Sequence, residues 1–301
     1  MSEQIVLRTD GLEKCYRGFE LGPISLALAG GYVYSIMGQN GSGKSTLFKL
    51  LTGMAQPEKG SVEWLGDGHV IGSGMVATAQ TRSKIAYVPD ELDIPDMSWS
   101  LYAWKEFVSG LYPDWNGPKY RRLVERYNLD ENKSMRRSSK GSRRKAALVI
   151  ALSQEPQVLL VDEPSAGLDP FAWKMMLEDF AEFMASGDKT ILMATHIMEE
   201  IRRLGDYICF VHEGQLFGPY EKDALMDSWR MLWVDGLPGT AHRLPGVVAV
   251  EQQLPVRLIT NAPKETEAAL EELGLAIVNQ RALEWDELFW HVIRTKDRSI
   301  Y

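Results

Sequence analysis

The sequence predicts an α/β fold with a parallel sheet, and three features of the chain carry this prediction. Residues 158–161 and 190–195 are continuous apolar runs, as expected for strands that are buried on both faces. A helical pattern at residues 172–184 separates them, so strand and helix alternate. The third feature is the alternating, β-prone run 32–37, which a glycine-rich turn joins to the helix-forming run 46–51. The order strand, glycine turn, helix organises the rest of the chain.

The glycine-rich turn has the phosphate-binding pattern G-x-x-x-x-G-K-S over residues 38–45. Its backbone N–H groups and the following helix N-terminus form an anion site, and glycine lets the backbone approach a phosphate closely. We expect Lys44 to reach the β- and γ-phosphates of a nucleoside triphosphate, and the Ser45 hydroxyl to ligate Mg²⁺. A chance match is the alternative, but the flanking strand and helix argue against it. The expected nucleotide contacts are Gly38, Asn40, Gly41, Ser42, Gly43, Lys44, Ser45 and Thr46.

Polar residues follow two of the apolar strands at the ends where a parallel sheet binds ligands. Asp162 and Glu163 come directly after residues 158–161, and His196 follows residues 190–195. In a phosphoryl-transfer site, Asp162 is expected to hold the Mg²⁺ shell, while Glu163 orients and deprotonates the attacking water. A charged strand terminus without chemistry is the alternative, which the upstream phosphate loop disfavours.

Composition narrows the class of protein. The chain is 45% apolar and 25% charged, as in ordinary globular proteins, and its net charge of −8 does not suggest bulk attraction to nucleic acid. Its two cysteines, Cys15 and Cys209, lack metal-type spacing and fit a reducing compartment. The N-terminus does not resemble a signal peptide, and the apolar runs are too short to span a bilayer. We expect a soluble, cytoplasmic chain that acts on a membrane only through a partner.

The remaining chain divides into three further regions. The β-rich residues 5–36 contain expected strands at 5–7 and 24–28, with turns at 17–18 and 22–23. Tyr16 lies between these strands, and it either stacks on a nucleotide base or packs at a strand end. A strand at 61–65 and a turn at 66–68 come next, and a strand at 85–89 ends at Asp90.

Residues 91–150 have helical character, with helices expected at 102–111 and 120–127. The aromatic residues of this inserted helical subdomain either fill its core, which is favoured, or form a docking surface. Those residues are Trp99, Tyr102, Trp104, Phe107, Tyr112 and Trp115. The basic run 133–145 is either a solvated face, a nucleic-acid patch or a surface near a phosphate tail.

From residue 222 to 301 the pattern predicts a small α/β domain whose role the sequence does not indicate. Strands are expected at 230–234, 247–252, 256–260 and 276–278, and helices at 265–273 and 286–294.

Taken in order, the motifs in residues 1–221 resemble the nucleotide-binding subunit of an ATP-binding cassette (ABC) transporter, which has a P-loop NTPase core. Residues 38–45 match the Walker A loop, and residues 158–163 match the Walker B strand with Glu163 as its catalytic glutamate. Residues 165–169 resemble the D-loop. By the same resemblance His196 is the switch histidine and Tyr16 the aromatic that stacks on the base.

Two positions depart from the family pattern. In the signature, usually L-S-G-G-Q, Ser139 and Gly141 are kept, whereas Lys140 replaces a glycine and Ser142 the glutamine. Asp90 stands in place of the Q-loop glutamine, where a Mg²⁺ ligand is expected. Both changes resemble the branch that serves ABC-2-type exporters, which includes antibiotic, bacteriocin and Ytr-like ATPases.

The resemblance implies an ATPase that works as a dimer. Two subunits enclose two ATP molecules, each held by Walker A of one subunit and by Ser139, Gly141 and Ser142 of the other. Glu163, His196 and Lys44 are the implied catalytic residues, and Ser45, Asp162 and Asp90 the implied Mg²⁺ ligands. The implied partners are an integral membrane permease, which exports a drug, peptide or lipid, and a second ATPase subunit, with no nucleic acid.

Such a chain is held at the inner face of the cell membrane by its binding to the permease.

Two other functions are open on the residues alone. One is a soluble ABC protein that acts on nucleic acid or ribosomes, suggested by the basic run 133–145. The other is a nucleotide sensor with little turnover, suggested by Asp90 and the altered signature.

Overall fold

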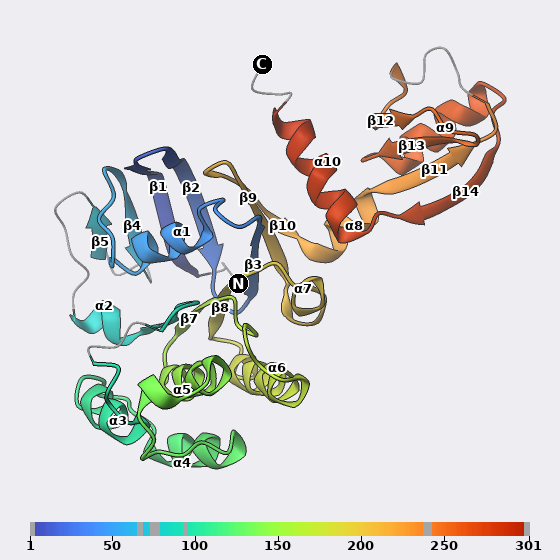
Figure 1. Cartoon of the computed structure of the whole chain (residues 1–301). Helices are drawn as coiled ribbons and strands as arrows, with labels where there is room; N and C mark the ends of the chain where they lie inside the picture. Colours follow the sequence, from blue (N-terminus) through green and yellow to red (C-terminus); the bar gives the residue numbers. More distant parts are fainter. Residues whose placement is uncertain (1–3, 65–68, 73–78, 93–95, 237–242, 298–301) are drawn as a thin grey trace. The chain divides into compact units, whose positions relative to one another are not determined.

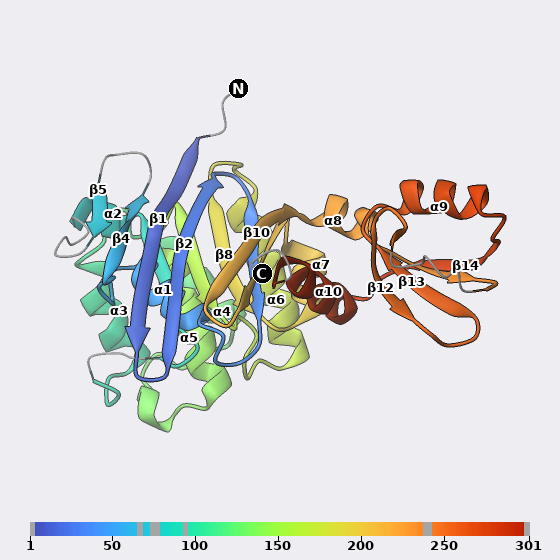
Figure 2. The ribbon, with the colours of Figure 1, turned by 90° about the horizontal axis from the view of Figure 1, so that it is seen from above.

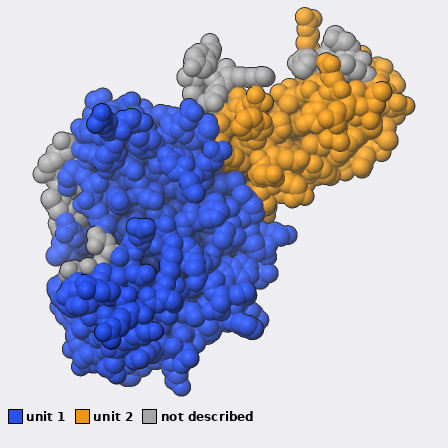
Figure 3. Space-filling view, in the orientation of Figure 1, with its two compact units in different colours: residues 1–219 blue, residues 220–301 orange. Residues whose placement is uncertain are grey.

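The structure is a computed structural model that describes residues 4–64, 69–72, 79–92, 96–236 and 243–297. The chain divides into two compact units, Met1–Pro219 and Tyr220–Tyr301, close to the boundary expected at residue 221 (Figure 3). The turn expected at residues 66–68 lies outside the described residues.

A six-stranded sheet forms the centre of the first unit, in the order β10-β9-β3-β8-β7-β6 (Figure 1). β3 pairs in parallel with β8 and β9, while β7 pairs in parallel with β8 and β6. Every residue of β7 and β8 is buried, which confirms the prediction made from their apolar runs. The strands are β3 (Val33–Gly38), β6 (Ile85–Val88), β7 (Val158–Asp162), β8 (Thr190–Thr195), β9 (Tyr207–His212) and β10 (Gln215–Glu221).

A second, four-stranded sheet contains the N-terminal strands β1 (Ile5–Tyr16) and β2 (Phe19–Ala29), with β4 (Lys59–Trp64) and β5 (His69–Gly72). β1 and β2 form a long antiparallel hairpin, visible from above in Figure 2. The prediction of a turn at residues 22–23 is wrong, because both residues lie within β2. Leu12 pairs with Ile24 and Lys14 with Leu21, so the pairing absorbs Gly22 and Pro23 as a register shift.

Two hydrophobic clusters cover the faces of the six-stranded sheet. On one face, α1 (Lys44–Leu51) packs with inward residues of the N-terminal sheet and with alternate residues of β7 and β8. On the other face, the intervening residues of β7 and β8 pack against α5 (Lys140–Ser153) and α6 (Pro170–Met184). The sheet is therefore buried on both sides, as parallel sheets are. The short helices of this unit are α2 (Ala79–Ser83) and α7 (Met198–Leu204).

The inserted helical region contains α3 (Leu101–Ser109) and α4 (Gly117–Arg126) beside the first part of α5. Side chains cap both helices, since Ser100 accepts from the backbone N–H of Ala103, and Asn116 accepts from that of Lys119. Most of its aromatic residues fill the core, as favoured from the sequence, and two lie at the surface. Trp104 is buried; Trp99, Tyr112 and Trp115 pack partly buried against the core; Tyr102 and Phe107 are exposed.

In its described residues the second unit contains an antiparallel sheet in the order β12-β13-β11-β14 and the helices α8, α9 and α10. Leu232, Val234, Val256 and Leu258 on one face of the sheet pack against Leu270, which lies in α9. The strands predicted at 230–234 and 256–260 are confirmed, whereas β14 is longer than expected. The elements are α8 (Lys222–Ser228), β11 (Arg230–Val234), β12 (Val247–Glu251), β13 (Val256–Thr260), α9 (Pro263–Glu272), β14 (Ile277–Ala282) and α10 (Trp285–Asp297).

Candidate active site

The phosphate-binding loop lies between the end of β3 and the start of α1, as the sequence predicts. Gly43 is the N-cap of α1 and has φ +113°, in the left-handed region that favours glycine. A Cβ on Gly43 would lie 2.7 Å from Cδ1 of Leu21 and 2.8 Å from Cζ of Phe19. The loop is therefore packed tightly against the N-terminal hairpin at Gly43, where a larger residue would not fit, and α1 presents its N-terminus after this loop, as an anion site requires.

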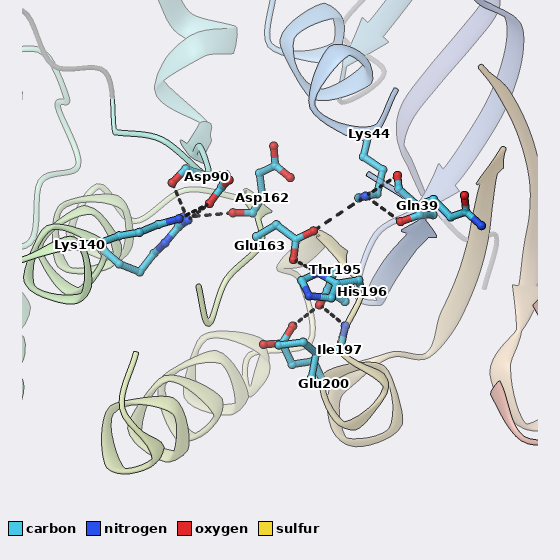
Figure 4. Close-up of polar contacts among 12 residues, drawn as sticks. Gln39, Lys44, Asp90, Lys140, Asp162, Glu163, Thr195, His196, Ile197 and Glu200 are labelled. Carbon is cyan, nitrogen blue, oxygen red and sulfur yellow. Dashed lines mark hydrogen bonds and ion pairs between the residues drawn. The ribbon is translucent and has the colours of Figure 1, made fainter. Parts of the chain in front are cut away.

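Lys44 is buried at the start of α1, and its ammonium group is held by the loop itself. Nζ donates hydrogen bonds to the carbonyl oxygens of Gly38 at 2.8 Å and Gln39 at 3.2 Å, and lies 3.9 Å from Oε1 of Glu163 (Figure 4). These contacts aim the lysine at the space between the loop and the end of β7. A triphosphate bound there would lie beside an ammonium group that is already in position, so little conformational entropy would be lost in ordering the lysine.

Asp162 ends β7 and is almost fully buried. Burial raises the pKa of its carboxyl group, and a hydrogen bond with the Ser45 side chain opposes that rise. Oδ1 of Asp162 has no hydrogen-bond partner among the described residues. Since buried polar atoms are normally paired, a carboxylate oxygen in this state beside a serine hydroxyl fits a hard, oxygen-binding cation.

A cavity of about 210 Å³ joins these groups. It is lined by residues from the phosphate loop, the ends of β6 and β7, and the N-terminal hairpin. They are Phe19, Asn40, Gly41, Gly43, Lys44, Ser45, Thr46, Asp90, Asp162 and Glu163. Ser45, Asp162 and Asp90 thus share one cavity, as a common metal site requires.

Glu163 follows Asp162 in the left-handed region, with φ +50°, and its N–H donates to the carbonyl oxygen of Ala194 at 2.8 Å. Its side chain faces His196, whose Nδ1 lies 2.7 Å from Glu163 Oε2 (Figure 4). A carboxylate beside an imidazole at the mouth of a phosphate cavity is a suitable pair for orienting and deprotonating a water.

Asp90 is held by two cations from α5. Arg144, which is buried, donates to Asp90 Oδ1 at 3.0 Å, and Lys140 Nζ lies 3.5 Å from the same oxygen. Arg144 also donates to three carbonyl oxygens, those of Pro89 at 2.7 Å, Asp90 at 2.8 Å and Asp162 at 3.1 Å. Desolvation lowers the pKa of Arg144, and the neighbouring carboxylates oppose that shift. One arginine thus joins the start of α5 to the ends of β6 and β7.

The residues at the start of α5 form a second N-terminus suited to an anion. Ser139 is the N-cap, and its Oγ accepts from the N–H of Ser142 at 3.1 Å and lies 2.9 Å from the Ser142 hydroxyl. A Cβ on Gly141 would lie 2.4 Å from the carbonyl oxygen of Gly167, so only glycine permits this approach. None of Ser139, Gly141 or Ser142 is among the described residues that line the phosphate-loop cavity.

A sequence model of the ABC transporter family matches residues 21–166. The Nod factor export ATP-binding protein I of Rhizobium johnstonii is 32% identical over 225 residues, which cover 72% of this chain and 70% of that protein. The chain belongs to the ABC transporter ATP-binding proteins. It is an ABC ATPase, the ATP-binding and ATP-hydrolysing subunit of a transporter.

Two further similarities extend this result. The ABC transporter ATP-binding protein YtrB of Bacillus subtilis is 25% identical over 273 residues, which cover 88% of this chain and 90% of that protein. An ATP-binding cassette solved as a dimer in a post-hydrolysis state, bound to ADP and Pi, matches with a TM-score of 0.62 and 21% identity over 71% of this chain and 98% of that chain. The first unit therefore has the ABC ATPase fold. Among the described residues, no helix is both long enough and apolar enough to cross a membrane.

The fold of the ABC ATPase brings most of the predicted site together but leaves two groups apart. The Walker A residues, Asp90, Asp162, Glu163 and His196 meet at one edge of the six-stranded sheet. Neither the signature residues nor Tyr16 are among the described residues that line that cavity, and Tyr16 is 47% exposed at the tip of the hairpin. Tyr16 therefore keeps both of its possible roles.

Sequence reasoning missed three residues in and around the ABC ATPase site. Phe19 lines the cavity, and its position opposite Tyr16 across the hairpin turn was a usable signal. Arg144 was considered only as part of a basic run. Glu200 is a buried acid in the first turn of α7, and its only sequence signal was its closeness to His196 along the chain.

Proposed function

We propose that this ABC ATPase dimerises around two ATP molecules and powers a separate membrane permease of the exporter type. The observation that carries the proposal is the separation of two anion sites on one chain. The Walker A cavity contains the chemistry but has no signature residue in its lining, while Ser139 begins a second helix N-terminus of its own. A second subunit that contributes its signature would complete each site.

Each residue at the cavity then has a defined part in hydrolysis. The loop N–H groups and Lys44 bind the β- and γ-phosphates, and Glu163 takes a proton from the attacking water that His196 helps to orient. Ser45, Asp162 and Asp90 would hold Mg²⁺, which when bound neutralises charge on the phosphate oxygens. The orphaned Oδ1 of Asp162 supports this metal assignment.

Similarity to proteins of known exporters supports export. Nod factor export ATP-binding protein I is one such relative, and YtrB matches along 88% of this chain, which must include part of the second unit. We infer that the ABC ATPase lies at the inner face of the cell membrane, bound to the permease, and that the exported molecule is a drug, a peptide or a lipid. The second ATPase subunit is another copy or a related chain.

Replacing the proposed base tests the mechanism. Glu163→Gln keeps the size of the side chain but removes the proton acceptor, so ATP turnover should fall at least about 100-fold. The variant should also form a stable dimer with ATP, which size-exclusion chromatography with light scattering detects, and remain monomeric with ADP. Turnover equal to that of the unaltered protein would refute the role of Glu163.

The permease is tested separately, by purifying the tagged protein from detergent-solubilised membranes and identifying what accompanies it. An integral membrane protein is the expected partner. Recovery of RNA or ribosomal proteins instead would contradict the transport proposal.

A further inference from the structure

His196 is the most exposed member of the proposed catalytic group, and this raises the question of what holds it in place. Its side chain is 65% exposed, while that of Glu163 is 14% exposed. The ring lies in the short connection between β8, which ends at Thr195, and α7, which begins at Met198. Little packing surrounds so exposed a ring, so its direction depends on its contact with Glu163 at 2.7 Å and on the backbone on both sides of His196.

A buried carboxyl group holds that backbone. Glu200 in the first turn of α7 has no exposed surface, and its Oε2 accepts a hydrogen bond of 2.5 Å from the Thr195 hydroxyl. The same Thr195 oxygen accepts from the backbone N–H of Ile197 at 3.0 Å. Carboxylate, hydroxyl and amide thus form a chain that connects the residues immediately before and after His196 (Figure 4).

Burying the Glu200 carboxyl group lowers the stability of the fold, which argues that this residue has a functional role. Burial raises the pKa of Glu200 and the negative charge of Glu163 adds to this, while hydrogen bonds with Ser165, Thr195 and Trp173 oppose the rise. No cationic side chain of the described part of the chain forms an ion pair with it. A buried carboxyl without a cation destabilises a fold, and an apolar side chain of similar size would normally pack better there.

Asp179 in α6 gives an instructive contrast, because it is also a buried carboxyl in the same unit. Tyr127 donates to it at 2.6 Å, and Arg126 lies 3.4 Å away. Asp179 therefore has a cation beside it, whereas Glu200 has none among the described residues and is hydrogen-bonded to Thr195, in the connection that carries His196.

We propose that Glu200 is a positioning residue for hydrolysis, which through Thr195 and Ile197 holds His196 against Glu163. The inference rests on the proposed roles of His196 and Glu163. Glu200 is not among the described residues that line the phosphate-loop cavity, so its effect on turnover is expected to pass through His196. Displacement of a catalytic group by about 1 Å can lower a rate about 100-fold.

The test removes the hydrogen-bond acceptor while keeping the volume. Glu200→Met should lower kcat between about 10-fold and 100-fold, with the KM for ATP changed less than about twofold, because binding relies on the phosphate loop. Thr195→Val breaks the same chain from its other side and should have a similar effect. Glu200→Gln retains an acceptor oxygen and should restore most of kcat.

The decisive comparison uses the His196→Ala background. If Glu200 acts through His196, Glu200→Met lowers kcat no further in that background. Asp179→Leu is the matched control, since it also removes a hydroxyl-bonded buried carboxyl, and it should lower the melting temperature without lowering kcat.

Three outcomes overturn the inference. Glu200→Met could lower kcat by the same factor with and without His196, which would show a merely structural role. Glu200→Met could leave kcat unchanged while His196→Ala lowers it, which would refute the role of Glu200 and leave that of His196 intact. Finally, His196→Ala could retain full turnover, and the proposed role of His196 would then fail together with that of Glu200.

Discussion

The phosphate-loop side of the site and the side formed by Asp90 and the start of α5 are built on different physical principles. The loop at residues 38–45 offers backbone N–H groups, a helix N-terminus and one lysine held by backbone carbonyls. The other side relies on charged side chains, with Arg144 and Lys140 around Asp90. The first side keeps the family pattern throughout, and the second contains every departure from it.

This difference shows how each side can change. A backbone cradle has no side chain to exchange, and at Gly43 even a Cβ would meet Leu21 and Phe19. Charged side chains can be exchanged, provided their partners change with them. Asp90 and Lys140, two departures that look independent in the sequence, contact one another through space. Asp90, Lys140 and Arg144 are therefore best understood as one group of interacting charges.

The largest expected effect lies on the phosphate-loop side. Lys44→Ala removes the only side-chain cation that the structure places in the described lining of the cavity, so ATP turnover should fall at least about 100-fold. Lys49→Ala, an exposed lysine in the same helix, is the control and should be neutral. Turnover within tenfold of normal in Lys44→Ala would weaken the contrast between the two sides.

Arg144 comes next, since it is buried and binds four acceptors. Arg144→Gln should destabilise the protein by about 2 kcal/mol, less than a fully buried ion pair because Asp90 is 40% exposed. A thermal melt measures the loss. If the two residues act as a set, adding Asp90→Asn should cost less in the Arg144→Gln background than alone. Strict additivity of the two losses would show that they are independent.

Tyr16 tests whether the nucleotide site extends to the hairpin tip. If the ring stacks on the base, Tyr16→Ala should weaken ATP binding by about 1 kcal/mol, roughly fivefold in Kd. Titration with a fluorescent ATP analogue measures this, and Tyr102→Ala, an exposed ring on α3, serves as the control. An unchanged Kd would instead assign Tyr16 to packing at the strand end.

The smallest effect on stability is expected at Lys140. Its ion pair with Asp90 is exposed on both sides, 58% and 40%, so Lys140→Gln should change stability by less than about 0.5 kcal/mol. The melting temperature should move by less than about 2 °C. A larger drop would show that Lys140 contributes to folding as Arg144 does.

The sequence was a good guide where local pattern and burial agree. The apolar runs of β7 and β8 and the glycine-rich turn before α1 identified the sheet edge and most of the cavity. Each of these signals lies within a few consecutive residues, and none depends on a distant partner.

The failures share a dependence on distant contacts. Gly22 and Pro23 have the local signal of a turn, but pairing of Leu21 with Lys14 and Ile24 with Leu12 carries the strand through them. Arg144 looks like one charge of a solvated run, yet its partners lie at the ends of two strands distant in sequence. Only the fold reveals such partners, because each depends on where another segment ends.

Arg144 also determines how α5 can move. Its guanidinium binds the ends of β6 and β7 at once, so any rotation of α5 that preserves these bonds must turn about this side chain. Along the helix, Lys140 lies about 6 Å from that pivot and Ser153 about 13 Å, at 1.5 Å per residue. The two ends of the helix therefore lie at unequal distances from Arg144. In such a rotation the far end of α5 would sweep about twice the arc of the end that begins at Ser139.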